Sequence, residues 1–288
     1  MQFLLLQTIN SIALGSLLFL LASGFSLIFG LMRITNFTHA AFYMIGSYVG
    51  FAVMSRTSSF LMAVLVATLV TPVVGYGIFR WFLFRLWGQP FSQVLLCLGF
   101  LFVIDDLLLY VFGGVPRTIA LPSLLSGTVS IAGAGFPTYR LFLIALGAVV
   151  AIFLHLLVER TKIGSLIRAG VDDQETTRAL GVNINRVFVT TYLLGSALAG
   201  MAGALGGPIL GMEPRMCFAI LPLALAVVII GGLGSLKGAF WGSIIVGFVD
   251  NFGRAFFPDF SYFALFLPMA VILTFRPSGL FGGERMVD

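Results

Sequence analysis

The first long apolar run of the chain is residues 9–31, INSIALGSLLFLLASGFSLIFGL, which contains no Asp, Glu, Lys or Arg. About 20 predominantly apolar residues suffice for a helix to cross the hydrocarbon core of a bilayer. Further apolar runs lie at 37–54, 60–80, 92–112, 138–158, 187–207, 217–232, 238–252 and 261–275. The sequence therefore predicts an all-α polytopic membrane protein with eight to ten transmembrane helices, some of them short or broken. The short, glycine-interrupted runs at 217–232 and 238–252 are expected to be tilted, broken or re-entrant.

The composition supports the same class. Of the 288 residues, 59% are hydrophobic and 9% are charged, whereas a typical soluble domain has about 25% charged residues. No polar segment is long enough to bury a core of its own, so residues 1–288 are predicted to form a single transmembrane domain. Cys97 and Cys217 both lie in apolar runs, which predicts two buried thiols and no disulfide.

The distribution of basic residues predicts the orientation. The loop at about 159–186 carries the densest group of Lys and Arg, which places it in the cytoplasm by the positive-inside rule. Alternation from this loop puts five of the 16 basic residues outside and the other 11 inside. The outer five are Arg56, Arg117, Arg140, Arg215 and Arg254. The net charge of +5 is thus explained by sidedness and does not indicate nucleic-acid binding.

Motifs for chemistry on this chain are absent from the sequence. The stretch GGLGSLKG at 231–238 comes nearest to a phosphate-binding loop, but it lacks the Gly-Lys-Ser/Thr that holds phosphate and magnesium. His39 and His155 lack metal-ligand spacing. We expect neither an enzyme nor a chain that binds a cofactor or metal, so ATP-driven work would require another subunit.

Polar groups at the limits of the apolar runs are the candidate translocation residues. A polar group in a membrane span is tolerated when it has a partner or faces a wet, protein-lined passage. We expect Asp105 or Asp106 on the outer half of a route, and on its cytoplasmic half Asn36, His39, Gly231, Gly232, Gly234 and Ser235. The alternatives are interfacial anchors in the stretch RITNFTHAAFY (33–43), ion-paired or helix-capping aspartates, and a plain turn at the glycines.

Two further segments carry patterns. The stretch GSLIRAGVDDQETTRALGVN (164–183) predicts a short amphipathic helix followed by a turn at Gly181, which is either a solvated connector or a docking helix for a cytoplasmic partner. Its candidate docking residues are Arg168, Ala169, Asp172, Asp173, Leu180 and Gly181. Small residues recur every four positions at Gly195, Ala199, Gly203 and Gly207, which predicts close helix packing in lipid.

Taken together, these segments resemble the permease subunits of branched-chain amino-acid ABC importers of the leucine/isoleucine/valine type. The carriers of the resemblance are GLMRITNFTHAAFYMIGSYV, RAGVDDQETTRALGVNINRV, IIGGLGSLKGAFWGSIIVG and the tail RPSGLFG, in order along nearly the whole chain. It implies a bacterial inner-membrane protein that pairs with a second, usually different, permease chain. Two cytoplasmic ATPases, which bind the ATP and magnesium, would dock on the coupling segment, and a periplasmic binding protein would deliver the solute.

The solute is left open by the sequence. The span before the glycine-rich segment reads ILPLALAVVIIGG, without the Lys that is frequent there in the family, and an Asp pair stands near a place where relatives commonly have uncharged amides. Relatives of this kind carry leucine-like amino acids, urea, short amides or organic acids. A secondary transporter or channel is the alternative function, with Asp105 and Asp106 as its only candidate coupling-ion site.

Overall fold

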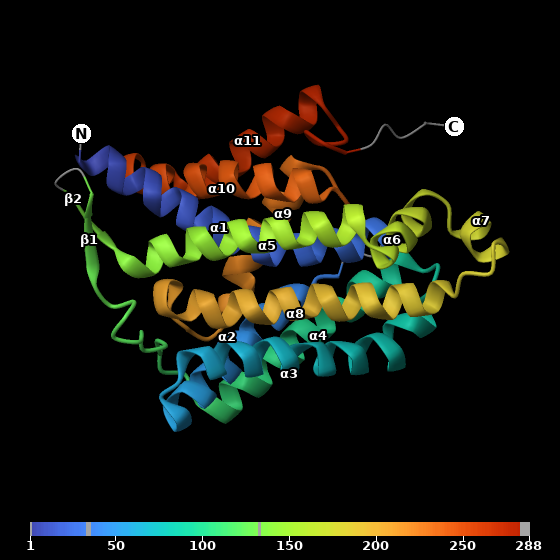
Figure 1. Ribbon diagram of the computed structural model, residues 1–288, viewed down its shortest axis with the longest axis horizontal. Coiled ribbons are helices and arrows are strands. Elements are labelled where there is room, and N and C mark those ends of the chain that lie inside the picture. Colours follow the sequence, from blue (N-terminus) through green and yellow to red (C-terminus); the bar gives the residue numbers. More distant parts are fainter. Residues whose placement is uncertain (1, 33–35, 132–133, 283–288) are drawn as a thin grey trace.

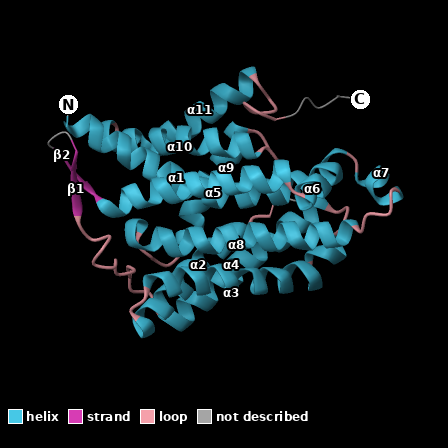
Figure 2. Cartoon of the chain, viewed as in Figure 1, coloured by secondary structure: helices cyan, strands magenta, loops and turns pink. Residues whose placement is uncertain are grey.

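The computed structural model describes residues 2–32, 36–131 and 134–282, and this part of the chain is mostly helical (Figures 1 and 2). Its long helices, of 15 residues or more, are α1 (Gln2–Met32), α2 (Thr38–Thr57), α3 (Phe60–Trp81), α4 (Pro90–Phe112), α5 (Thr138–Arg160), α8 (Ile184–Leu210), α9 (Met216–Gly231), α10 (Leu236–Phe256) and α11 (Ser261–Phe275). Two shorter helices, α6 (Lys162–Asp172) and α7 (Gln174–Ala179), connect α5 to α8. The predicted apolar runs and the long helices agree within a few residues, except that α1 begins earlier.

The long helices form a bundle with two distinct ends. Helices α6 and α7 and the last described residues lie at one end, and the N-terminus lies at the other, beside strands β1 (Thr128–Ile131) and β2 (Ala134–Pro137) (Figure 1). We call the first the elbow end, after the bend formed by α6 and α7, and the second the strand end. Within the described part of the chain, five helices, α1, α3, α4, α5 and α8, are both long and apolar enough to cross a membrane. Neither α9 nor α10 is broken along its length. The glycines between these two helices therefore form a turn, which lies at the elbow end.

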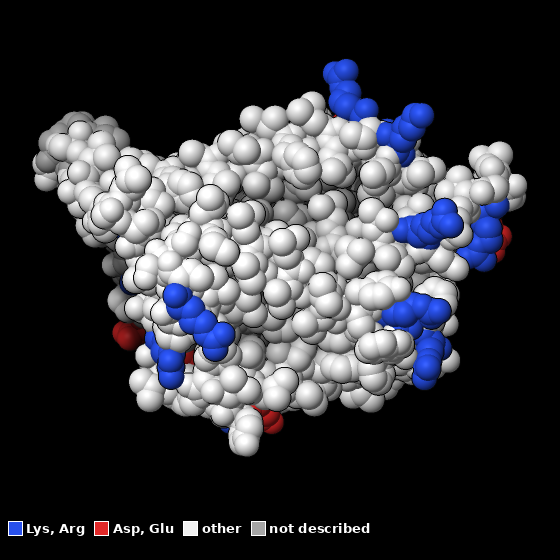
Figure 3. Space-filling view, turned by 60° about the horizontal axis from the view of Figure 1, so that its bottom comes forward, with Lys and Arg blue, Asp and Glu red and all other residues white. Residues whose placement is uncertain are grey.

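Charged side chains gather toward the two ends and leave an uncharged band between them (Figure 3). The chain order places Arg56, Arg117, Arg140, Arg215 and Arg254 at helix ends or loops of the strand end. The basic residues of α6 and α7, with Arg80, Arg85, Lys237 and Arg276, belong to the elbow end. Arg33 and Arg285 lie outside the described residues. This grouping matches the predicted alternation and is the one expected of a multi-pass membrane protein.

Helix α1 runs through the middle of the bundle, with 83% of its most apolar stretch buried. It packs against α10, α8 and α5, while α2 packs against α8 and α3. We call α1, α2 and α8 the inner layer. Glycines permit its close crossings, because Cβ atoms at Gly24 and Gly46 would collide with the backbones of Gly195 and Gly200 on α8.

The outer helices α3, α4 and α5 bury only 28%, 22% and 22% of their most apolar stretches. Their remaining faces are apolar and exposed, as expected for surfaces that meet lipid or another membrane subunit. Both cysteines are free and buried, as the sequence predicts.

The segment between α4 and α5, residues 113–137, is rich in Gly, Pro and Ser, yet it contains regular structure. Strands β1 and β2 pair antiparallel, with Thr128 opposite Pro137. Arg117 and Met212 exchange two backbone hydrogen bonds of 2.8 and 2.7 Å, which tie this loop to the segment after α8. The Arg117–Met212 pairing joins residues that are far apart in the sequence, so no local pattern signals it.

Candidate functional site

A cluster of polar side chains lies where α1, α2, α4 and α8 meet. The amide of Asn36 donates through Nδ2 to the hydroxyl of Tyr192 at 3.0 Å, and the thiol of Cys97 donates to Asn36 Oδ1 at 3.4 Å. The hydroxyl of Thr38 donates to the carbonyl of Cys97 at 3.2 Å. We call these residues, with His39, the polar junction. All five are buried, so their hydrogen bonds offset the desolvation that burial imposes.

His39 occupies the side of the polar junction that faces α1. Its Nε2 lies 2.9 Å from the carbonyl oxygen of Leu21, which can only accept, so Nε2 carries the proton. The ring meets Phe25 and Phe42 edge-on, and Nδ1 has no partner among the described residues. Asn36 and His39 are each 1% exposed, so the junction is closed in this conformation. Their place along a solute route stays a prediction.

The predicted glycine segment forms the turn between α9 and α10. A Cβ at Gly231 would collide with the backbone of Gly238, and one at Gly232, which has φ +104°, would collide with Gly282. The backbone N–H groups of Leu280 and Phe281 donate to the carbonyls of Ile230 and Gly231, each at 2.9 Å. Gly231 and Gly232 therefore permit close backbone packing of the C-terminal segment here.

Gly234 and Ser235 lie in the second half of the same turn. Gly234, with φ +84°, approaches Gly30 at the end of α1, and the Ser235 hydroxyl accepts from the N–H of Gly238, capping α10. Both residues also border a groove between α1, α5 and α10. His39 meets the carbonyl of Leu21, well before the end of α1, whereas Gly234 approaches Gly30 close to that end, so the polar junction and the glycine turn are separate sites.

Asp105 and Asp106 have opposite environments although they are neighbours in α4. Asp105 is 3% exposed, and its Oδ1 accepts from the backbone N–H of Arg215 at 3.0 Å. Arg215 is the residue before α9 and has φ +67°, so Asp105 caps a second helix from a distance. The structure thus gives Asp105 the helix-capping role among the alternatives, because the start of α9 comes to rest against it.

Asp106 faces away from the subunit. It is exposed and, among the described residues, forms neither a hydrogen bond nor an ion pair. It belongs to a stripe along α4 in which Phe91, Leu95 and Tyr110 are 81%, 63% and 89% exposed and Gly99 has open space around it. Asp106 lies between the middle and the end of α4, so its cost in lipid is below the value of about 2.5–3.5 kcal/mol that insertion scales give for a carboxylate at the bilayer centre. We call this stripe the outer face of α4. The carboxylate of Asp106 indicates that this face contacts water, solute or another protein.

The predicted docking segment forms a bent pair of helices, which we call the elbow. The side chain of Gln174 donates to the carbonyl of Leu31 at 2.9 Å, which fixes the elbow to the end of α1. Thr177 Oγ1 lies 2.9 Å from the carbonyl of Ala169 and joins α7 to α6. These contacts join the elbow to the inner layer.

The side chains of the elbow divide into anchors and exposed groups. Asp173 caps α7 by accepting from the N–H groups of Glu175 and Thr176 at 2.9 and 3.0 Å. The pKa of the Asp173 carboxyl lies below its usual value because the carboxyl accepts hydrogen bonds, and the bond from the Thr176 hydroxyl has the largest effect. Arg168 donates to the carbonyl of Val158 and pairs with Glu159 at 3.6 Å. The side chain of Asp172 lies outside those described.

Two predicted docking residues project from the elbow end. Leu180 is 79% exposed, and Gly181 has φ +84°, the left-handed turn that the sequence predicts. Ala169 is also exposed. Leu180 is therefore exposed at the elbow, whereas Ile167 of α6 is only 3% exposed. A single exposed leucine is common on protein surfaces, so the docking role of Leu180 stays a prediction.

The small residues of α8 face two different helices. A Cβ at Gly195 would meet Gly24 of α1, and one at Gly203 would collide with the carbonyl of Tyr43 in α2. Ala199 is fully buried between them, and Gly207 packs against Ile119 of the outer loop. These contacts all lie within the subunit.

Sequence analysis missed two groups of side chains. At the strand end, Arg254 pairs with Asp250 through Nε at 2.9–3.0 Å, and Arg140 hydrogen-bonds to Asn10. At the elbow end, His155 and Lys237 face the groove bordered by Ser235. The first group draws on α10, α5 and α1, and the second on α5 and α10. Two local signals existed: Asp250 and Arg254 are spaced i,i+4 on one helix, and Lys237 stands in the first turn of that helix, where a cation is disfavoured.

Comparison with known proteins identifies the relatives of the chain. Residues 7–275 match the family described as branched-chain amino acid transport system / permease component. The chain is 29% identical to the high-affinity branched-chain amino acid transport system permease protein BraD of Pseudomonas aeruginosa, over 96% of this chain and 95% of that protein. It is 28% identical to the permease protein LivH of Escherichia coli, over 98% and 97%. Among solved structures, PsaBC from Streptococcus pneumoniae in complex with Fab gives a TM-score of 0.46 at 14% identity, covering 91% of this chain and 87% of that one.

Proposed function

Because the chain belongs to the family of branched-chain amino acid transport system permease components, we propose that it is half of the pore of an ATP-driven importer in the bacterial inner membrane. A second permease chain of different sequence supplies the other wall of the passage. Two cytoplasmic ATPases bind and hydrolyse ATP with magnesium. A periplasmic protein delivers the solute at the strand end.

The elbow is the observation that carries this proposal. It projects from the bundle, exposes Ala169 and Leu180, and is fixed to the end of α1 through Gln174. A force applied to the elbow by an ATPase therefore reaches the inner layer directly. The sequence itself has no phosphate-binding loop, so nucleotide chemistry belongs to the docked partner.

The outer face of α4 is the part of the subunit that we assign to the passage. Ionisable groups within membrane spans generally face the bundle interior or a water-filled cavity. Asp106 faces outward and lacks a partner in the described chain, so the cavity it requires lies between this subunit and the second permease. Asp106 thus contacts the passage from the outer half of α4.

The chemistry of this face favours a solute with a cationic group and an apolar portion. A carboxylate attracts an ammonium group and repels a bare anion. Phe102 and Val103, one turn from Asp106, are 55% and 61% exposed and offer apolar contact. A branched-chain amino acid has both parts, and so do related amino acids. Urea or a short amide would use Asp106 as a hydrogen-bond acceptor only.

The same carboxylate favours one competing function, an ion-coupled transporter that works without an ATPase. Affinity purification of the tagged chain from its native membranes separates the two. Our proposal predicts that an ATPase co-purifies and that the reconstituted complex takes up radiolabelled leucine only with ATP. Uptake by the chain alone, driven by a proton or sodium gradient, would establish the competing function.

A variant of the elbow tests the docking role itself. Ala169→Trp adds bulk to an exposed position, so the subunit should insert and fold normally while ATPase binding falls at least tenfold. Ala145→Trp, at an exposed position of α5 outside the elbow, is the matched control. Equal ATPase binding by both variants would overturn the assignment of the elbow.

A further inference from the structure

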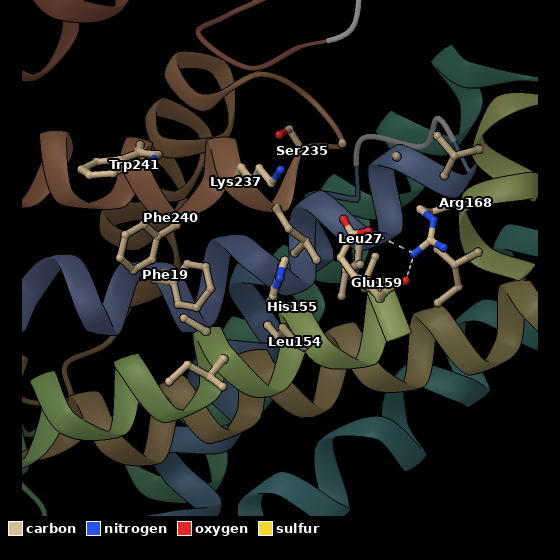
Figure 4. Close-up of a pocket in the computed structure, with 18 residues that line it drawn as sticks. Phe19, Leu27, Leu154, His155, Glu159, Arg168, Ser235, Lys237, Phe240 and Trp241 are labelled. Carbon is tan, nitrogen blue, oxygen red and sulfur yellow. Dashed lines mark hydrogen bonds and ion pairs between the residues drawn. The ribbon is translucent and has the colours of Figure 1, made fainter. Parts of the chain in front are cut away.

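A groove of about 590 Å³ lies on the side of the subunit, between α5 and α10 and over α1, and α6 of the elbow contributes Ile167, Arg168 and Val171 to its lining. Helix α1 forms its floor with Phe19, Leu27 and Gly30. Figure 4 shows Leu154 and His155 entering from α5, and Lys237, Phe240 and Trp241 entering from α10.

The lining changes character along the groove. Glu159, Arg168, Ser235 and Lys237 lie toward the elbow end, whereas Phe19, Phe240 and Trp241 lie deeper in the bundle (Figure 4). The floor from Gly30 to Phe19 extends roughly 16 Å at 1.5 Å per helical residue. A polar mouth at the end of the spans, followed by an apolar trough, has the same polarity gradient as one leaflet of a bilayer.

The charge at the mouth is not balanced within the described chain. Arg168 is paired with Glu159 at 3.6 Å, but Lys237 forms no ion pair among the described residues. Lys237 also stands in the first turn of α10, where the helix dipole favours an anion. His155 points toward Lys237 across the groove (Figure 4). An anion bound between them would offset both the free charge and the dipole.

We propose that this groove binds one phospholipid with an anionic headgroup from the leaflet at the elbow end. The headgroup phosphate contacts Lys237 and His155, and one acyl chain lies along Phe19, Phe240 and Trp241. Basic pockets between transmembrane helices on the cytoplasmic side are suited to such headgroups. The lipid would fill the space between α5 and α10 and thereby brace α5, which leads into the elbow. The proposal does not depend on the identity of the transported solute.

Lipid retention by the intact transporter tests this site. The complex is equilibrated in vesicles of phosphatidylcholine and phosphatidylglycerol, extracted in mild detergent, and the lipids retained per complex are counted by mass spectrometry. Lys237→Gln should reduce retained phosphatidylglycerol about fivefold, the loss expected for one basic group near an anionic membrane surface. Lys162→Gln, which changes the exposed lysine at the start of α6, should have no effect, and retained phosphatidylcholine should not change in either variant.

A second pair of variants tests the trough without changing charge. Ala151→Trp fills the groove lining and should also reduce retained phosphatidylglycerol, whereas Ala145→Trp, outside the groove on the same helix, should not. Equal retention across either pair would overturn the proposal. Release of the lipid by inorganic phosphate alone would overturn it in favour of a phosphate site, and release by the transported solute would overturn it in favour of a passage.

Discussion

The inner layer of α1, α2 and α8 and the outer face of α4 both carry polar groups within the spans, but they satisfy them differently. In the inner layer, Asn36 has Tyr192 and Cys97 as partners, and glycines bring backbones into contact. On the outer face, Asp106 has no partner in the described chain, and a Cβ added at Gly99 would meet nothing within 4 Å. Polar groups with internal partners hold the subunit together, whereas those without partners identify a surface that other molecules complete.

The largest difference between the two regions is expected from a pair of glycine substitutions. Gly203→Leu forces a side chain into the Tyr43 carbonyl of α2, so the backbone must move. The loss in the free energy of unfolding should therefore exceed the roughly 1–3 kcal/mol of ordinary overpacking. Little folded protein should be recovered in a fluorescence-detected size-exclusion assay.

Gly99→Leu is the matched change on the outer face of α4, where a side chain meets open space. The isolated subunit should keep its wild-type melting temperature, while assembly with the second permease weakens. Normal recovery of Gly203→Leu, or collapse of the isolated Gly99→Leu subunit, would break the comparison.

A pair of tyrosines provides the next test. Tyr192→Phe leaves the buried Asn36 amide without its acceptor at an almost unchanged volume, so stability should fall by about 1–3 kcal/mol. Tyr110→Phe removes the hydroxyl of a residue of α4 that is 89% exposed, so the melting temperature should not change. Thermal unfolding of both variants in the same detergent measures the difference, and equal melting temperatures would show that the polar junction contributes no stability.

The two neighbouring aspartates should separate stability from transport. Asp105→Leu removes the cap of α9 and should lower the melting temperature, because the N–H of Arg215 loses its acceptor. Asp106→Asn should leave the melting temperature unchanged and lower ATP-driven uptake about tenfold, which corresponds to about 1.4 kcal/mol. Uptake at the wild-type rate by Asp106→Asn would remove Asp106 from the passage.

The smallest expected effect lies in the elbow, outside both regions. The pKa of Asp173 is lowered by its hydrogen bonds, first of all from the Thr176 hydroxyl. A depressed pKa means that the cap stabilises α7 above the unfolded pKa of about 3.9, and that this contribution is lost as pH falls through the folded pKa. An NMR titration of the carboxyl carbon should show a midpoint below 3.9 that rises in Thr176→Val but not in Thr190→Val.

The sequence predicted the helices well because length and hydropathy determine them. It did not separate Asp105 from Asp106, since neighbouring helix residues point about 100° apart and the rotation of α4 depends on what packs against it. The partner of Asn36 is Tyr192, 156 positions along the chain, so its hydrogen bond had no local signal. The elbow was easier to predict because its turn and amphipathic pattern are local, although the exposure of Leu180 depends on how the elbow packs.

The groove could not be predicted from the sequence for the same reason. Its floor and walls come from α1, α5 and α10, three helices that are far apart in the chain. Its only local indication was a lysine in the first turn of a helix. The glycines at 231–234 present the opposite case, in which a local pattern is visible but ambiguous. A glycine-rich pattern does not distinguish a turn that packs closely from one that borders a passage.

The most direct test of the central claim, that the outer face of α4 borders the passage, is thiol labelling of the assembled transporter. In a background with Cys97 and Cys217 replaced, Asp106→Cys and Leu65→Cys are treated with a small water-soluble thiol reagent; Leu65 is 51% exposed on α3 and serves as the lipid-facing control. The account predicts that position 106 reacts, that the transported solute slows the reaction, and that position 65 stays unreactive. If position 106 is as unreactive as position 65 in every nucleotide state, the outer face of α4 does not border the passage.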